Sequence, residues 1–204
     1  MKSRNSNIEL LRIILMILIV AHHYVVHSGL IDIANATPTI NGKTIFLQIF
    51  GAWGKTAINC FVLITGYFMC KSTITLSKFF KLVCEILFYN ILISCIFIIF
   101  GKAELSAKLI LVEWLPIIRL NSRFIGAFLF LYLLIPFLNI FIKNLSQKQH
   151  GYLVLLLLTT QTVLSVLPYM DIQCDYLLWF PTIYLLSSYI RFYENSFRIV
   201  ALGG

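Results

Sequence analysis

Long runs of apolar residues, separated by short polar segments, recur along the whole chain. A helix needs about 20 apolar residues to cross a bilayer, and somewhat fewer where neighbouring helices shield it. The apolar positions do not alternate with polar ones, so the pattern favours helices over the strands of a barrel. The sequence therefore predicts an all-α polytopic transmembrane bundle with about six spans, at residues 8–27, 57–70, 79–100, 124–142, 152–167 and 177–192.

Two segments depart from this simple pattern. The second run, residues 57–70, is short for a span, so we expect it to continue into residues 45–56 or to be shielded from lipid. Residues 105–118 are apolar but are interrupted by Glu113 and Pro116, which is typical of a re-entrant, interfacial or additional spanning element. We expect residues 1–204 to form a single transmembrane domain.

The composition supports a membrane protein and excludes several other classes. Hydrophobic residues make up 60% of the chain and charged residues 12%, whereas soluble domains have roughly 45–50% and about 25%. The net charge of +8 comes from basic residues that flank apolar runs. This placement indicates orientation and contact with anionic membrane lipid rather than nucleic-acid binding. The five cysteines lack metal-ligand spacing, so no metal is expected.

The distribution of Lys and Arg predicts which side of the membrane each loop faces. With a cytoplasmic N-terminus, the inner segments hold nine basic residues: Lys2, Arg4, Lys71, Lys78, Lys81, Lys143, Lys148, Arg191 and Arg198. The outer segments then hold six: Lys43, Lys55, Lys102, Lys108, Arg119 and Arg123. Because cytoplasmic loops carry the excess of positive charge, we expect a multi-pass protein of the cell membrane with its N-terminus inside.

The first apolar run carries ionisable residues that hydrocarbon disfavours. An ionisable residue within a span is a candidate functional residue because leaving it unpaired in lipid costs several kcal/mol. Arg12 and His23 are eleven residues apart, which brings a helix back to within about 20° of its starting direction and separates them by roughly 16 Å along the axis. Glu9 and Arg12 have the i,i+3 spacing of a helical ion pair.

Two interpretations of these residues remain open at this point. Arg12 fits a site for a phosphate-bearing cytoplasmic ligand, but it also fits an anchor that reaches to the inner headgroups. His23 fits a base that accepts a proton from a nucleophile, because histidine titrates near neutral pH. Alternatively, His22, His23 and His27 are polar residues at the outer interface.

Four stretches, in order along the chain, resemble one family of membrane proteins. The first is Glu9-Leu-Leu-Arg12 followed after ten residues by His23, and the others are residues 60–68 (CFVLITGYF), 124–139 (FIGAFLFLYLLIPFLN) and 178–191 (LWFPTIYLLSSYIR). Together they resemble the Arg-x10-His signature and the later spans of the acyltransferase type-three family. Members of this family are bacterial membrane proteins that O-acylate sugars.

The resemblance implies a particular reaction. It implies a membrane O-acyltransferase that moves an acyl group, expected to be acetyl, from cytoplasmic acetyl-CoA to a hydroxyl of a cell-surface glycan or its lipid-linked precursor. His23 would be the catalytic base or an acyl-carrying nucleophile. The donor phosphates would be bound by Arg12, Lys78 and Lys81, and the acceptor sugar by Arg119, Asn121 and Arg123.

The sequence also fits another function and a shorter architecture. A polar first helix could line the path of a transporter or flippase subunit for a glycan or lipid intermediate. Family members have more spans than the six predicted here. We therefore expect this chain to be an N-terminal part, completed by a missing C-terminal part or another membrane subunit, or else an inactive truncated remnant.

Several further residues are predicted to be structural. The small pair Thr65-Gly66 should let helices approach closely. We expect three aromatic residues to pack between the helices of the bundle or to lie at the membrane interface: Tyr67, Trp179 and Tyr184. We expect Glu85 to be buried in the third span and to pair with Lys81, four residues earlier.

Overall fold

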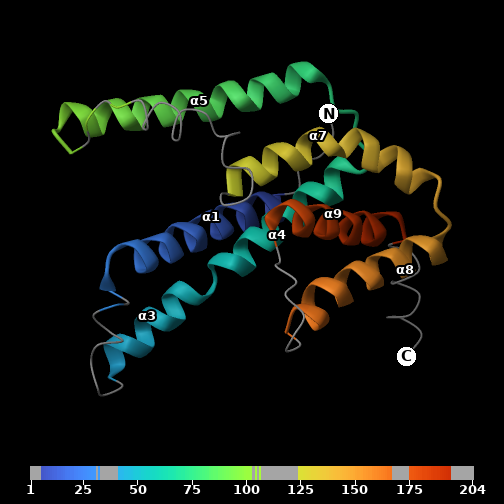
Figure 1. Ribbon diagram of the computed structural model, residues 1–204, viewed down its shortest axis with the longest axis horizontal. Coiled ribbons are helices and arrows are strands. Elements are labelled where there is room, and N and C mark those ends of the chain that lie inside the picture. Colours follow the sequence, from blue (N-terminus) through green and yellow to red (C-terminus); the bar gives the residue numbers. More distant parts are fainter. Residues whose placement is uncertain are drawn as a thin grey trace. The chain divides into compact units, whose positions relative to one another are not determined.

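The computed structural model describes residues 6–30, 32, 41–102, 104, 106, 124–166 and 175–193. Every regular element in this part of the chain is a helix (Figure 1), which confirms the all-α prediction. The elements are α1 (Ser6–His27), α3 (Gly42–Ala52), α4 (Gly54–Met69), α5 (Leu76–Ile99), α7 (Phe124–Lys143), α8 (Gln147–Leu158), a π-helical turn η2 (Thr159–Val163), a 3-10 turn η3 (Leu164–Val166) and α9 (Tyr176–Phe192). The broken stretch at 105–118 lies outside the described residues, apart from Ser106.

Four helical segments in the described part are long and apolar enough to cross a membrane: α1, the α3–α4 pair over Gly42–Met69, α5 and α7. Only Trp53 separates α3 from α4. The short second run therefore continues into residues 45–56, as expected. The last two predicted spans are also helical, but α8 has 12 residues and α9 has 17. The count of six spans is therefore not confirmed.

Local side-chain caps explain where two of the helices begin. The side chain of Asn41 accepts a hydrogen bond from the Thr44 amide at 3.0 Å at the start of α3. At the start of α8, Ser146 Oγ accepts from the Gln149 amide while Gln149 Oε1 accepts from the Ser146 amide. Such caps satisfy amides that have no partner within the helix, so these residues fix where α3 and α8 start.

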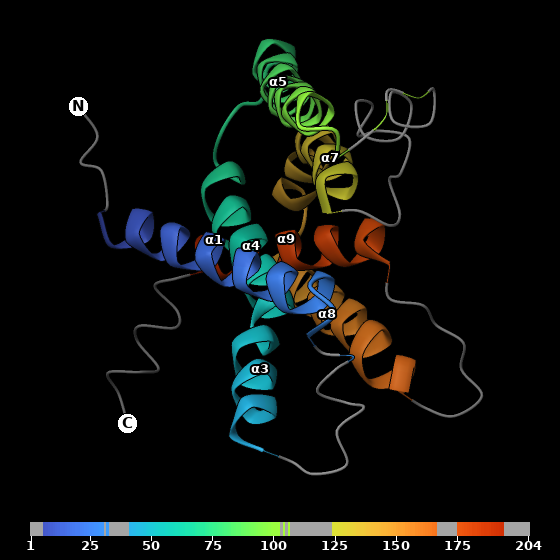
Figure 2. The same ribbon diagram turned by 90° about the vertical axis from the view of Figure 1, so that its left-hand side faces the viewer.

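The chain divides into two compact units, Met1–Thr65 and Gly66–Gly204. In the first unit, α1 packs on α3, and the fully buried Val25 lies against Gly51. In the second unit, α9 lies between α7 and α8 and packs against both, an arrangement visible in both Figure 1 and Figure 2.

The core of the second unit is built around α9. Phe180 and Tyr184 are fully buried, together with Leu131 and Ile135 of α7. An added Cβ at Gly66 would lie 3.0 Å from Ser187 Cβ and 3.2 Å from Tyr184 Cδ2, closer than most side chains tolerate. The predicted close approach at Gly66 and the predicted packing role of Tyr184 are therefore both confirmed.

Candidate functional site

The first helix places Arg12 and His23 on one uninterrupted segment. Helix α1 runs from Ser6 to His27 without a proline or a break. The rotation of about 20° and the separation of roughly 16 Å expected for eleven residues therefore apply, and both side chains project from one face. Arg12 Nη1 lies 3.7 Å from Glu9 Oε1, which confirms the predicted i,i+3 pair.

The histidines at the end of α1 have different surroundings. His23 and His27 are exposed within this chain, and their rings stack with centroids 5.4 Å apart and planes 10° from parallel. His22 is half-buried, and its Nδ1 lies 2.6 Å from the carbonyl oxygen of Gly51. His23, the predicted base, is therefore on the exposed side of α1, whereas His22 contacts α3.

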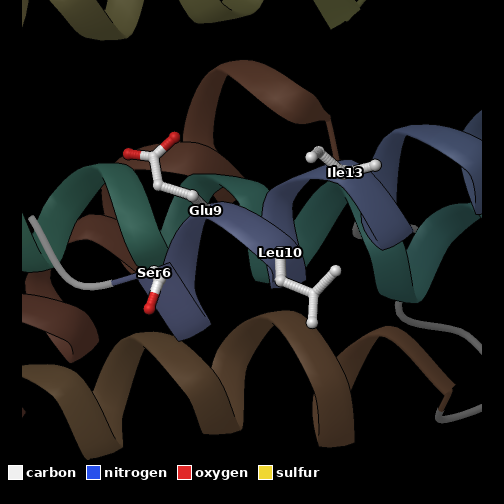
Figure 3. A pocket seen from close by; sticks show the side chains of 4 residues that line it. All are labelled: Ser6, Glu9, Leu10 and Ile13. Carbon is white, nitrogen blue, oxygen red and sulfur yellow. The ribbon is translucent and has the colours of Figure 1, made fainter.

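A hollow of about 400 Å³ lies beside the first turns of α1 and is lined by Ser6, Glu9, Leu10 and Ile13 (Figure 3). All four of these residues belong to α1, and neither Arg12 nor His23 is among them. Glu9 is paired with Arg12 at 3.7 Å, and no basic side chain lines the hollow itself, so the hollow offers no positive charge of its own to the phosphates of a donor.

The predicted donor-binding lysines lie on the first two turns of α5. Lys78 Nζ donates to the Thr73 carbonyl at 3.0 Å, and Lys81 Nζ lies 3.9 Å from Glu85 Oε1. The Lys81–Glu85 pair is as predicted, but the expected burial of Glu85 is wrong, because its side chain is 56% exposed. Helix α5 buries none of its side chains within this chain, so a position in the middle of an apolar run does not imply burial.

The predicted site residues are distributed over different parts of the chain. Arg12 and His23 belong to the unit Met1–Thr65, whereas Lys78 and Lys81 belong to Gly66–Gly204. The predicted acceptor-binding residues lie outside the described residues: Arg119, Asn121 and Arg123.

A polar contact that sequence reasoning missed joins α7 and α9 to the end of α4. Tyr184 Oη donates to Asn139 Oδ1 at 2.6 Å. Asn139 Nδ2 donates in turn to the carbonyls of Met69, at 3.1 Å, and Ser72, at 3.5 Å. The last carbonyls of a helix have no partner within it, so Asn139 satisfies the end of α4 while Tyr184 holds Asn139 in place.

A second missed contact joins α4 to the end of α9. Arg191 Nη1 donates to Tyr67 Oη at 2.8 Å, and the guanidinium lies 4.5 Å from the centre of the Tyr67 ring. Lys71 Nζ lies 5.3 Å from the centre of the Phe192 ring. Cations over aromatic faces are attracted to the ring quadrupole. This end of the second unit therefore holds two positive charges against aromatic side chains.

The neighbouring Cys70 is buried at 1% exposure in this region. Its Sγ donates to the Tyr67 carbonyl at 3.4 Å, which holds the side chain against α4. Its role is packing.

The four residues in these two contacts all belong to the motif stretches quoted from the sequence: Tyr67, Asn139, Tyr184 and Arg191. The available signal was the presence of hydrogen-bonding groups inside apolar runs, where polar groups need partners. The sequence did not show which of them would meet, because that depends on how α4, α7 and α9 pack.

We expect Asn139→Ala to destabilise the protein by about 1–3 kcal/mol, because it removes the hydrogen bonds that Asn139 makes to the Tyr184 hydroxyl and to the Met69 and Ser72 carbonyls. Tyr184→Phe should have a smaller effect in the same direction, since Asn139 keeps its bonds to α4. Thermal unfolding of the detergent-solubilised protein measures both changes. Asn144→Ala is the matched control because Asn144 is exposed and bonds only locally, to Ile140. Equal stability of the Asn139 and Asn144 variants would contradict this role.

The long apolar helices define an integral membrane protein whose first helix carries a paired arginine and a cluster of histidines. The family model of the acyltransferase 3 family, described as an acyltransferase domain, matches residues 5–202. The chain therefore belongs to the acyltransferase 3 family and is a membrane acyltransferase. No curated protein and no solved structure matches it significantly.

Proposed function

We propose that the protein transfers an acetyl group from cytoplasmic acetyl-CoA to a hydroxyl of a cell-surface glycan or its lipid-linked precursor, at the cell membrane. Membership of the acyltransferase 3 family supports acyl transfer over the transport of a glycan or lipid intermediate. The observation that carries the proposal is the placement of Arg12 and His23 on one face of the continuous helix α1.

The spacing of these two residues suits an elongated donor. In acetyl-CoA the phosphates and the thioester lie at opposite ends of the pantetheine arm. Arg12 would bind the phosphates, which the planar guanidinium does well, and Lys78 and Lys81 would add positive charge. His23, roughly 16 Å further along the axis, would lie near the thioester.

The proposed chemistry is a direct transfer. The imidazole of His23 accepts the proton of the acceptor hydroxyl, and the acceptor oxygen attacks the thioester carbonyl. The carbon–sulfur bond breaks as the new ester forms, and the thiolate of coenzyme A takes the proton from His23. Arg119, Asn121 and Arg123 would hydrogen-bond the acceptor sugar.

The test is transfer of label from acetyl-CoA to glycan. Membranes containing the protein are incubated with acetyl-labelled acetyl-CoA and the host glycan. We expect base-labile label in the glycan that depends on the protein. Movement of the glycan across the membrane without labelling would instead support a flippase and overturn the proposal.

The proposed donor site requires a cytoplasmic N-terminus. In a variant without native cysteines, an engineered cysteine at Asp175 should react with an impermeant maleimide in intact cells, whereas one at Ser77 should react only after the cells are opened. This result follows from the excess of Lys and Arg in the inner segments. The reverse pattern would place Arg12 at the outer surface and exclude it from binding cytoplasmic acetyl-CoA.

A further inference from the structure

The ring of His22 fits a notch where α3 passes into α4. Gly51 lies in the last turn of α3, and Gly54 begins α4 just after Trp53. A Cβ added at Gly54 would overlap the His22 ring at its Cγ, so only glycine leaves room for the ring there. The absence of a side chain at Gly54, next to the break at Trp53, creates the seat of His22.

A hydrogen bond fixes the ring in this notch. His22 Nδ1 lies 2.6 Å from the Gly51 carbonyl oxygen. Because a carbonyl oxygen can only accept, Nδ1 carries the proton and donates it. The last carbonyls of a helix lack amide partners within that helix, so His22 supplies a donor at the end of α3.

The same side of α1 makes the apolar contacts with α3. Ala21 and Val25 are buried, and a Cβ at Gly51 would lie 3.0 Å from Val25 Cγ1. This packing already restricts how α1 can rotate about its axis. The His22–Gly51 hydrogen bond is directional. His23 is one residue further along, about 100° around the helix, and is exposed.

We propose that His22 is a positioning residue, which fixes the rotation of α1 so that His23 and Arg12 face the reaction site. This inference rests on the proposed role of His23 as the base. The bond to Gly51 occupies only Nδ1 of His22 and leaves Nε2 available, so the variants below are chosen to separate positioning from proton transfer. A misplacement of about 1 Å can cost on the order of a hundredfold in rate, which sets the size of the expected effect.

Two conservative variants of His22 distinguish a positioning role from direct participation in the acyl-transfer chemistry. The amide nitrogen of Asn can occupy the place of Nδ1, whereas that of Gln reaches further, to the place of Nε2. We expect His22→Asn to keep kcat within a few-fold of the wild type and His22→Gln to lower it about ten- to a hundredfold. The pH midpoint of the residual activity should stay unchanged, because His23 remains the base. An inactive His22→Asn protein at normal abundance would show that His22 takes part in the chemistry and would overturn the proposal.

A substitution at Gly54, which lies against the His22 ring, should lower kcat as His22→Gln does. Gly54→Ala should displace the ring. Gly42→Ala is the matched control, because Gly42 lies in the same unit and has no atom within 4 Å of an added Cβ. Wild-type kcat in Gly54→Ala would contradict the proposed seat.

A readout independent of catalysis keeps this proposal distinct from the proposed function. In a variant without native cysteines, His23→Cys is labelled with a maleimide, with either His22 or His22→Gln beside it. We expect the labelling rate to change at least several-fold, because loss of the hydrogen bond lets α1 rotate. An unchanged rate would overturn the positioning role. A changed rate in a protein that transfers no acetyl group would uphold the positioning role and overturn the proposed function instead.

Discussion

Replacing His23 with alanine is expected to lower acetyl transfer by about 10²–10⁴-fold, the usual contribution of a general base. His23 is exposed within its unit, so its removal costs little packing and the protein should still accumulate in the membrane. The measurement is the initial rate of labelled acetyl transfer per amount of membrane-inserted protein. The loss should appear in kcat, because the acceptor hydroxyl is no longer deprotonated as the thioester is attacked.

Variants of the neighbouring histidines provide the controls for His23→Ala. His22→Asn should remain active because the Gly51 contact is preserved. His27→Ala removes the ring stacked on His23 and should reduce the rate far less than His23→Ala. Transfer by His23→Ala at more than a tenth of the wild-type rate would exclude His23 as the base.

The fold was predictable because hydrophobicity acts over whole segments. A span is identified by about 20 residues together, so single polar residues such as Glu85 do not hide it. The same length requirement predicted that the second run either continues into residues 45–56 or is shielded from lipid, and the segment does continue, as far as Gly42. The end of α8 was harder to predict from the sequence. The change to a π-helical turn at Thr159–Val163 is a local change in hydrogen bonding that hydropathy does not encode.

Within the candidate site, the distance along the sequence decides what could be predicted. The pairs Glu9–Arg12 and Lys81–Glu85 follow from helical spacing alone. The bond between Tyr184 and Asn139 joins residues 45 positions apart, and that between Arg191 and Tyr67 joins residues 124 apart. These longer contacts depend on which helices become neighbours, and local spacing along the sequence does not show which those are.

The glycines illustrate the same limit. Gly66 was predicted to allow a close approach because it lies next to Thr65 inside an apolar run, and it does contact Ser187 and Tyr184. Gly54 lies just before the predicted start of the second run at residue 57, where a glycine is usually taken for a turn residue. Its actual function is to admit the His22 ring, which requires knowledge of where α1 lies.

Replacing Arg12 with glutamine is expected to raise the KM for acetyl-CoA about ten- to a hundredfold. Hydrogen bonds to charged groups contribute about 1.5–3 kcal/mol each, which corresponds to this range. Arg12→Lys should give a smaller increase, since lysine keeps the charge but loses the planar, two-pronged geometry. Steady-state transfer at varied acetyl-CoA concentration measures both values.

Two control variants separate phosphate binding from the other effects of removing Arg12. Lys43→Gln removes an exposed positive charge from the same unit and should leave the KM unchanged. Glu9→Gln breaks the 3.7 Å pair with Arg12 but keeps the guanidinium, so it should not raise the KM. If Glu9→Gln and Arg12→Gln raise the KM for acetyl-CoA equally, then the Glu9–Arg12 ion pair, and not a contact between Arg12 and phosphate, determines the KM. An unchanged KM in Arg12→Gln, with less protein in the membrane, would identify Arg12 as an anchor at the headgroups.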